Sequence, residues 1–183
     1  DSLNFAAMLV LLGAGIKVQA VTYTAINTGD FSNAATFSPV GMPGSGDTVV
    51  VSNGVTLTVS DARTITALTV GRSGGSGSTL VISSPGSLTV SGQYGFSGTS
   101  PVINNNGTFS CNGGASFSTG AFNNNGTATF SGNAQAFNGT IAVTQSANAT
   151  LNLTAANSTP FGGSSTLSAS ASGNTVSYTT GQN

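Results

Sequence analysis

Short runs of alternating apolar and polar residues recur along the chain from Val21 to its end. Examples are T-V-V-V-S at 48–52, V-T-L-T-V at 55–59, T-L-V-I-S at 79–83 and T-V-S-Y-T at 175–179. Most runs hold apolar side chains at every second position, with Ser or Thr between them. An extended strand places successive side chains on opposite faces, so this period of two predicts half-buried β-strands.

Turn residues separate these runs. Gly, Asn and Ser-Pro sequences stand between the strand candidates, whose starts recur about every 8 to 12 residues. No segment after residue 20 has a convincing helical pattern. The passage 27–47 holds two prolines and four glycines, which favours an irregular loop or an entry cap. This strand spacing fits a sandwich, a barrel or a solenoid.

Internal repetition favours the solenoid. The block N-N-N-G-T-F-S at 104–110 is echoed by N-N-N-G-T-A-T-F-S at 123–131, and L-T-V recurs at 57–59, 68–70 and 88–90. A repeat of about 20 residues indicates stacked coils, in which equivalent Asn side chains form ladders and apolar residues stack inside. About seven coils from Thr48 onward predict a rod roughly 30–35 Å long.

The predicted fold is therefore all-β, a parallel β-solenoid (β-helix) of about seven short coils, with a β-sandwich as the alternative. Three regions follow from the pattern. They are an apolar N-terminal segment at 1–20, a turn-rich entry or cap at 21–47 and a solenoid repeat domain at 48–183.

The N-terminal segment has two interpretations. Its apolar run, residues 3–18, is shorter than a membrane span, which needs about 20 apolar residues, so we predict no stable span. It resembles the apolar core of a secretory signal, with Val18 and Ala20 near a cleavage point. If the segment is retained, it docks on a neighbouring subunit as a helix or as an added strand.

Charged residues are few and confined to the first part of the chain. Three basic and four acidic residues give a net charge of −1, and none of them lies between Ser73 and Asn183, where His is absent too. Proton-transfer catalysis and phosphate binding need such groups. We therefore predict no enzyme, no catalytic residue, no cofactor and no nucleic-acid partner. Asp30, Asp47 and Asp61 are candidate Ca²⁺ ligands, but turn capping is the favoured interpretation and no metal site is predicted.

Some polar and aromatic positions remain open to more than one interpretation. Cys111 is expected to be a small core residue. Tyr94, Phe96, Phe122 and Tyr178 fit either interior packing, which is favoured, or a platform on which sugars stack. Candidate glycosylation sequons, whose number is close to chance for this composition, begin at Asn106, Asn125, Asn138, Asn148, Asn152 and Asn157.

The passage 23–59 resembles the opening of secreted Bacteroidota-type surface proteins with β-solenoid repeats. It carries a Gly-aromatic-Ser-Asn stretch, then P-G-S-G-D at 43–47 and valine-rich strands that lead to L-T-V. The later N-N-G-T blocks are also similar to that family's repeats. The resemblance covers about residues 21–183 and implies a right-handed solenoid with a structural or adhesive role at the cell surface. Phe31 and Phe37 stand where such proteins often have Trp.

These features together predict a structural subunit of a self-assembling extracellular filament or cell-surface layer, pilus-like and homopolymeric. An unprotected C-terminal strand and an almost neutral surface favour head-to-tail contacts between copies. The alternative is a carbohydrate-binding or adhesin module with glycan partners. The residues predicted to make subunit contacts are Leu3, Phe5, Met8, Leu9, Val10, Leu11, Leu12, Ile16, Val176 and Tyr178.

Overall fold

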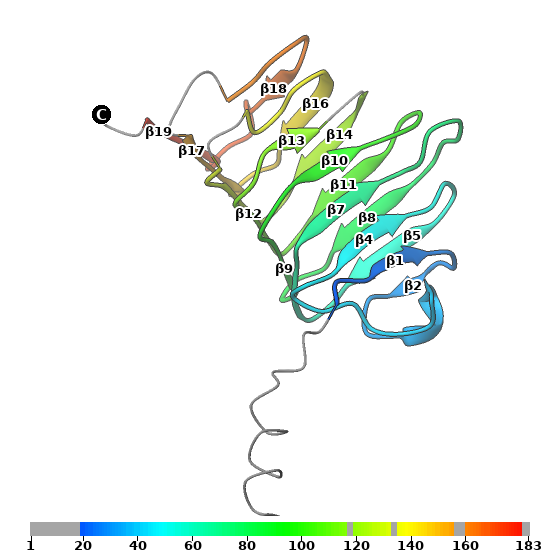
Figure 1. Cartoon of the computed structure of the whole chain (residues 1–183). Coiled ribbons are helices and arrows are strands. Elements are labelled where there is room, and N and C mark those ends of the chain that lie inside the picture. The colour runs from blue at the N-terminus through cyan, green and yellow to red at the C-terminus, as the bar shows by residue number, and fades with distance from the viewer. Residues whose placement is uncertain (1–18, 117–118, 133–134, 156–159, 181–183) are drawn as a thin grey trace, which may run out of the picture.

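The computed structural model of the chain describes residues 19–116, 119–132, 135–155 and 160–180. In this part the fold is built almost wholly from β-strands, and its one helical element is the short 3-10 helix η1 (Ala34–Thr36). The chain winds through three sheets and rises by one strand in each sheet per turn (Figure 1). The predicted contact residues at 3–16 lie outside the described residues.

Each sheet contains strands from successive turns in spatial order. Sheet A is ordered β13 (Ala115–Ser116), β10 (Tyr94–Phe96), β7 (Ala67–Val70), β4 (Thr48–Val51), β1 (Thr22–Ala25) and β3 (Phe37–Ser38). Sheet B is ordered β18 (Thr166–Ser168), β16 (Thr140–Gln145), β14 (Thr119–Asn124), β11 (Val102–Asn105), β8 (Thr79–Ile82), β5 (Thr56–Val59) and β2 (Gly29–Asp30). Sheet C is ordered β19 (Thr175–Thr180), β17 (Thr150–Ala155), β15 (Thr127–Phe130), β12 (Thr108–Cys111), β9 (Ser87–Val90) and β6 (Ala62–Ile65).

The predicted parallel β-solenoid is confirmed. All strand pairs among the described residues are parallel except β1 with β3, and the stack has about six turns, against the about seven expected. The repeat length varies because turns between strands differ in size. In sheet A, Val49 lies beside Leu68 and Leu68 lies beside Tyr94, and the second of these steps spans more of the chain than the first. Longer turns of this kind leave room for fewer coils.

The core lies between the three sheets and consists of columns of inward side chains. In sheet B one column contains Leu57, Leu80, Ile103, Phe122 and Val143, each at most 1% exposed. Because parallel pairing in register stacks equivalent positions, the period of two in the sequence becomes a continuous apolar interior.

Aromatic rings fill the upper half of this interior. Tyr94, Phe109, Phe122, Phe130 and Phe137 form a cluster with neighbouring ring centroids 4.9–5.7 Å apart. Tilted and edge-to-face pairs of this kind add to the stabilisation from burial. The packing interpretation is therefore confirmed for Tyr94 and Phe122, and Phe96 is also buried, at 4% exposure.

Cys111 is a buried free cysteine in the adjoining column of sheet C, as expected for a core residue. It lies between Val90 and Phe130 in the register of that sheet. Burial, partly offset by a hydrogen bond with the Gly113 backbone, raises the pKa of the thiol to about 11. The thiol is consequently protonated at neutral pH, which makes it a poor nucleophile and metal ligand.

The expected Asn ladders are present where sheet B turns toward sheet C. Asn105, Asn124 and Gln145 form a buried column, in which Asn105 Nδ2 donates to Asn124 Oδ1 at 2.7 Å and Asn124 Nδ2 to Gln145 Oε1 at 2.5 Å. Outside it, Asn123 Nδ2 donates to Asn104 Oδ1 at 2.8 Å. The offset between the two N-N-N-G-T blocks is thus one turn of the solenoid.

Among the described residues, no helix combines the length and the apolar character that a membrane crossing needs.

Candidate functional site

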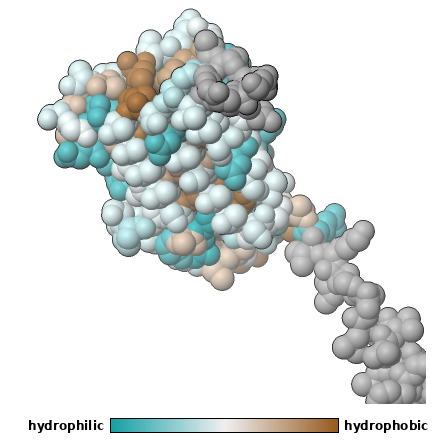
Figure 2. All heavy atoms as spheres, turned by 90° about the vertical axis from the view of Figure 1, so that its left-hand side faces the viewer, coloured by the Kyte–Doolittle hydropathy of each residue, from teal (hydrophilic) through white to brown (hydrophobic). Residues whose placement is uncertain are grey.

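Large exposed apolar side chains occur at both ends of the stack. Among the described residues they number six, three in the entry segment and three in the last turn. The sides of the solenoid present mainly Ser, Thr and Asn instead, and the side turned to the viewer in Figure 2 is largely pale, near-neutral surface. The six are Ile26, Val40, Met42, Leu167, Val176 and Tyr178. The two ends are therefore the candidate interaction surfaces.

The C-terminal end exposes positions that lower turns bury. Val176 is paired with Leu151 and is 40% exposed, whereas Leu151 is 0% exposed. Leu167 and Tyr178 likewise continue inward columns and are 37% and 45% exposed. The chemistry of these columns does not change at the last turn. What changes is that no further turn of the described chain covers them.

The edge strands at this end also retain pairing capacity. β19 pairs with β17 on one side, and within the described residues no strand pairs with its other side. Such an edge presents backbone N–H and C=O groups to any strand that approaches in register, and it is normally protected by charges, prolines or bulges. β19 has the sequence T-V-S-Y-T-T and contains none of the charged residues or prolines.

The N-terminal end is closed by the entry segment. β3 pairs antiparallel with β1 at the edge of sheet A, and the rings of Phe31 and Phe37 pack at 5.4 Å beneath the first turn. Both side chains are at most 1% exposed. Ile26, which follows β1, and Val40 and Met42, which follow β3, remain on the outside of this cap.

Arg63 ends an inward column at this cap. It is paired in register with Leu88, so it stands where every later turn has an apolar residue. Its Nε and Nη2 donate to the two carboxylate oxygens of Asp61 at 2.6 and 2.5 Å, and its guanidinium lies 5.5 Å from the Phe31 ring centre. The carboxylate of Asp61 in turn raises the pKa of Arg63. An ion pair therefore ends this inward column, while the lower backbone edge of β6 has no pairing strand among the described residues.

Asp30 is tied into the same end by hydroxyl groups. Burial opposes its ionisation, but hydrogen bonds from Ser32 and Ser60 and the charge of Arg63 outweigh this effect, so the pKa of Asp30 lies below its usual value. Asp47 accepts hydrogen bonds from the backbone N–H groups of Val21 and Gly44, which is the turn-capping role expected of it. The described residues contain no group of three or more His, Cys, Asp or Glu placed to hold a metal ion.

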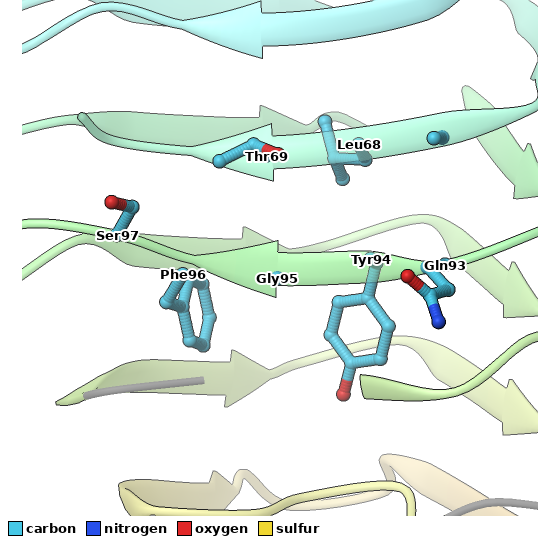
Figure 3. Close-up of a pocket in the computed structure, with 8 residues that line it drawn as sticks. Leu68, Thr69, Gln93, Tyr94, Gly95, Phe96 and Ser97 are labelled. Atoms are coloured by element: carbon cyan, nitrogen blue, oxygen red, sulfur yellow. The ribbon is translucent and has the colours of Figure 1, made fainter. Parts of the chain in front are cut away.

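A shallow hollow lies on sheet A around Gly95. Its volume is about 300 Å³, and Ala67, Thr69, Gln93 and Ser97 contribute to its lining. Figure 3 shows the Tyr94 and Phe96 rings on one side of β10, with Gly95 between them. The hollow has no ionisable side chain other than the buried Tyr94, whose pKa burial raises well above its usual value. It therefore lacks the groups that acid–base chemistry needs.

Two of the residues predicted to make subunit contacts, Val176 and Tyr178, are exposed at the C-terminal end. Leu167 is exposed there too and was not among the predicted residues, although T-L-S-A-S has the strand pattern. Ile26, Val40 and Met42 were also missed. Their signal was the presence of large apolar residues in a passage rich in Gly and Pro, where polar turn residues are usual.

The sugar-stacking interpretation is wrong for three of its four aromatic residues. Tyr94, Phe96 and Phe122 are at most 4% exposed, because the period of two directs them into the core. Only Tyr178 of the four is exposed.

The candidate sequons differ in accessibility. Asn106, Asn125 and Asn138 are exposed, and Asn125 donates through Nδ2 to Asn106 Oδ1 at 2.7 Å. Asn148 is exposed at a positive φ, and half-buried Asn152 donates through Nδ2 to Thr129 Oγ1. Asn157 lies outside the described residues. A glycan on Asn125 or Asn152 would use the nitrogen that makes the ladder contact.

Comparison of the chain with protein-family models, with curated proteins and with solved structures found no match.

Proposed function

We propose that this protein is a structural subunit that polymerises by stacking its C-terminal end on the N-terminal end of the next copy. The observation that carries the proposal is the exposure of Val176, Tyr178 and Leu167 at positions that preceding turns bury almost completely. Covering an apolar side chain of this size stabilises an assembly by about 1.5–3 kcal/mol when burial is complete. Several such contacts, together with strand pairing, favour association.

Head-to-tail stacking extends the parallel strand pairing of one subunit into the next copy. All strands of sheet C run in the same direction, so a copy in the same orientation continues the parallel pairing from β19 to β6. Within the described residues β6 pairs only with β9, which leaves its lower edge available. A contact between unlike ends repeats without closing and so produces a filament.

The apolar residues at the cap provide the second half of this contact. Ile26, Val40 and Met42 are 51–78% exposed. Of the charged residues in the first turns, Asp30 accepts hydrogen bonds from Ser32 and Ser60, and Asp61 is paired with Arg63. The C-terminal half of the chain carries no charge that would repel a neighbour.

We assign the filament or layer to the outside of the cell, as the resemblance to secreted surface proteins implies. The apolar N-terminal segment is part of the same proposal, as either a secretion signal or a second contact.

Stacked backbone hydrogen bonds and apolar columns hold the fold of the subunit together, and both are less sensitive to salt than ion pairs.

The test is a single substitution at the exposed end. Val176→Lys places a charge over the inward column, so we expect fibres in negative-stain images of the wild-type chain and their loss in the variant. Ser177→Lys is the matched control, because it adds the same charge to the same strand on the outward side. A wild-type chain that stays monomeric in sedimentation at high concentration would contradict the proposal, as would Val176→Lys fibres equal to those of the control.

The alternative of a carbohydrate-binding or adhesin module retains Tyr178 as its exposed aromatic. Saturable binding to a glycan array that is lost in Tyr178→Ala, by a chain that does not polymerise, would favour that function.

A further inference from the structure

The outward face of sheet C carries two parallel columns of small hydroxyl side chains. Each of the six strands of sheet C contributes one residue to each column, and β6 contributes the first position of both. The first column is Ala62, Ser87, Thr108, Thr127, Thr150 and Thr175, and the second is Thr64, Thr89, Ser110, Thr129, Asn152 and Ser177. Ten of these twelve positions are Ser or Thr.

All twelve side chains lie at the surface. None is buried, whereas the positions between them, such as Leu88, Phe109 and Leu151, are 0% exposed. Among the described residues, one side-chain hydrogen bond involves the columns, from Asn152 Nδ2 to Thr129 Oγ1. The other hydroxyl groups of the two columns point outward, so they can form hydrogen bonds with a partner that lies on this face.

The register fixes a two-dimensional lattice. Neighbouring members of a column are separated by the strand spacing of about 4.7–4.9 Å, and the two columns by two residues of rise, or about 6.6 Å. Unbroken parallel pairing of six strands repeats this cell along the whole sheet. Such a surface matches a partner that is itself periodic at these two spacings.

We propose that this face of sheet C binds ice. The oxygen lattice of ice repeats at spacings close to those of the two columns, so the threonine and serine hydroxyls meet lattice positions while the threonine methyl groups fill the spaces between them. The neutral ice lattice rejects ions, and the two columns carry no charged side chain. The nearest charges, Asp61 and Arg63, lie at the bottom of the sheet and are paired with each other.

The other faces do not offer the same array. The corresponding outward column of sheet B includes Val81, Asn104 and Asn123, and in sheet A the column of Val50 and Thr69 continues with Gly95, which has no side chain. Side chains of different length and shape break the lattice there. The proposal therefore concerns one face and is independent of end-to-end assembly, because stacking leaves the outward columns exposed.

Partition into slowly growing ice tests the proposal. The full chain fused to a fluorescent protein is mixed with dilute buffer, ice is grown on a cooled probe, and fluorescence in the ice is compared with that in the liquid. We expect the fusion to enter the ice and the fluorescent protein alone to be excluded. Thr108→Lys and Thr127→Lys, in the middle of the first column, are each expected to lose most of the incorporated fraction.

Thr144→Lys is the matched control, because it adds the same charge at an exposed outward position of sheet B, and it is expected to retain incorporation. Thermal unfolding of each variant verifies that the solenoid is intact, and Thr108 and Thr127 provide two independent positions if one variant fails to fold. Exclusion of the wild-type fusion from ice would overturn the proposal. Incorporation unaffected by both column variants would do the same, as would retention by crystalline cellulose or chitin with no partition into ice.

Discussion

Asn105 Nδ2 donates a hydrogen bond to Asn124 Oδ1 at 2.7 Å inside the solenoid, and both side chains are 0% exposed. The same nitrogen also donates to the Thr127 carbonyl at 2.9 Å, and Asn124 Nδ2 repeats the pattern with Gln145 and the Thr150 carbonyl. Each amide thus links its own turn to the one above. A buried polar column of this kind holds the turns in one register, because a shift by one residue would leave the amides without partners.

Asn124→Ala is expected to destabilise the protein by about 2–4 kcal/mol, because it leaves buried groups of Asn105 and Gln145 unsatisfied. Asn123→Ala is the matched control. Asn123 lies next to it on the outward side and donates to Asn104, so its loss is expected to be below about 1 kcal/mol. Urea unfolding followed by circular dichroism measures both. Equal losses in the two variants would show that the buried ladder has no special role.

The lower end of the ladder suggests a second substitution. Asn105 Oδ1 is the one buried side-chain polar atom without a hydrogen-bond partner among the described residues, and Ile82 lies beneath it in the register. Ile82→Asn supplies a donor at this position. Ile65→Asn is the comparison, because it buries an amide in the apolar column of sheet C. We expect Ile82→Asn to lose about 1–2 kcal/mol less unfolding free energy than Ile65→Asn.

The comparison again uses urea unfolding, with both variants referred to the wild type. If Ile82→Asn unfolds at the same or a lower urea concentration than Ile65→Asn, the unsatisfied oxygen of Asn105 does not accept the new donor.

The sequence predicted the solenoid well because the fold depends on local, repeated features. The paired Asn blocks and the period of two already contain the turn length and the inward positions. The N-N-N-G-T block alone does not show which Asn is buried. That depends on where each strand begins and on the register that places Asn105 beside Ile82.

The ends were harder to predict than the turns. Val176 and Leu151 have the same local pattern, and only the number of turns decides which of them is covered. Ile26, Val40 and Met42 are exposed because the entry loop folds across the first turn, which is a tertiary feature without a periodic signal. The hydroxyl columns of sheet C likewise require the register of six strands, although each T-x-T or T-x-S element is visible in the sequence.

A glycine column marks the corner between sheets B and C. A Cβ placed on Gly107 would lie 2.2 Å from the Gly86 carbonyl oxygen, and one on Gly126 would lie 2.1 Å from that of Gly107. Gly107→Ala therefore forces adjacent turns apart, and we expect a loss of about 2–4 kcal/mol, as for other overpacked sites. Gly46→Ala is the control, because a Cβ there meets nothing within 4 Å. Unchanged thermal unfolding of Gly107→Ala would mean that the corner is looser than the structure indicates.

Titration of Cys111 gives a prediction for alkaline pH. Burial raises the pKa of its thiol from 9.0 to about 11, so the unfolded chain releases this proton at a lower pH than the folded protein. The stabilisation from the buried neutral thiol is complete below pH 9 and is lost as the pH rises toward 11. The loss amounts to about 1 kcal/mol at pH 10.

Cys111→Ala removes this contribution, so the unfolding free energy of the variant should fall less between pH 8 and pH 10 than that of the wild type. Tyr94 is buried in both proteins and adds the same alkaline loss to each, so the difference between the two urea-unfolding series isolates the thiol. Parallel pH profiles would show that Cys111 ionises in the folded protein as readily as in the unfolded chain.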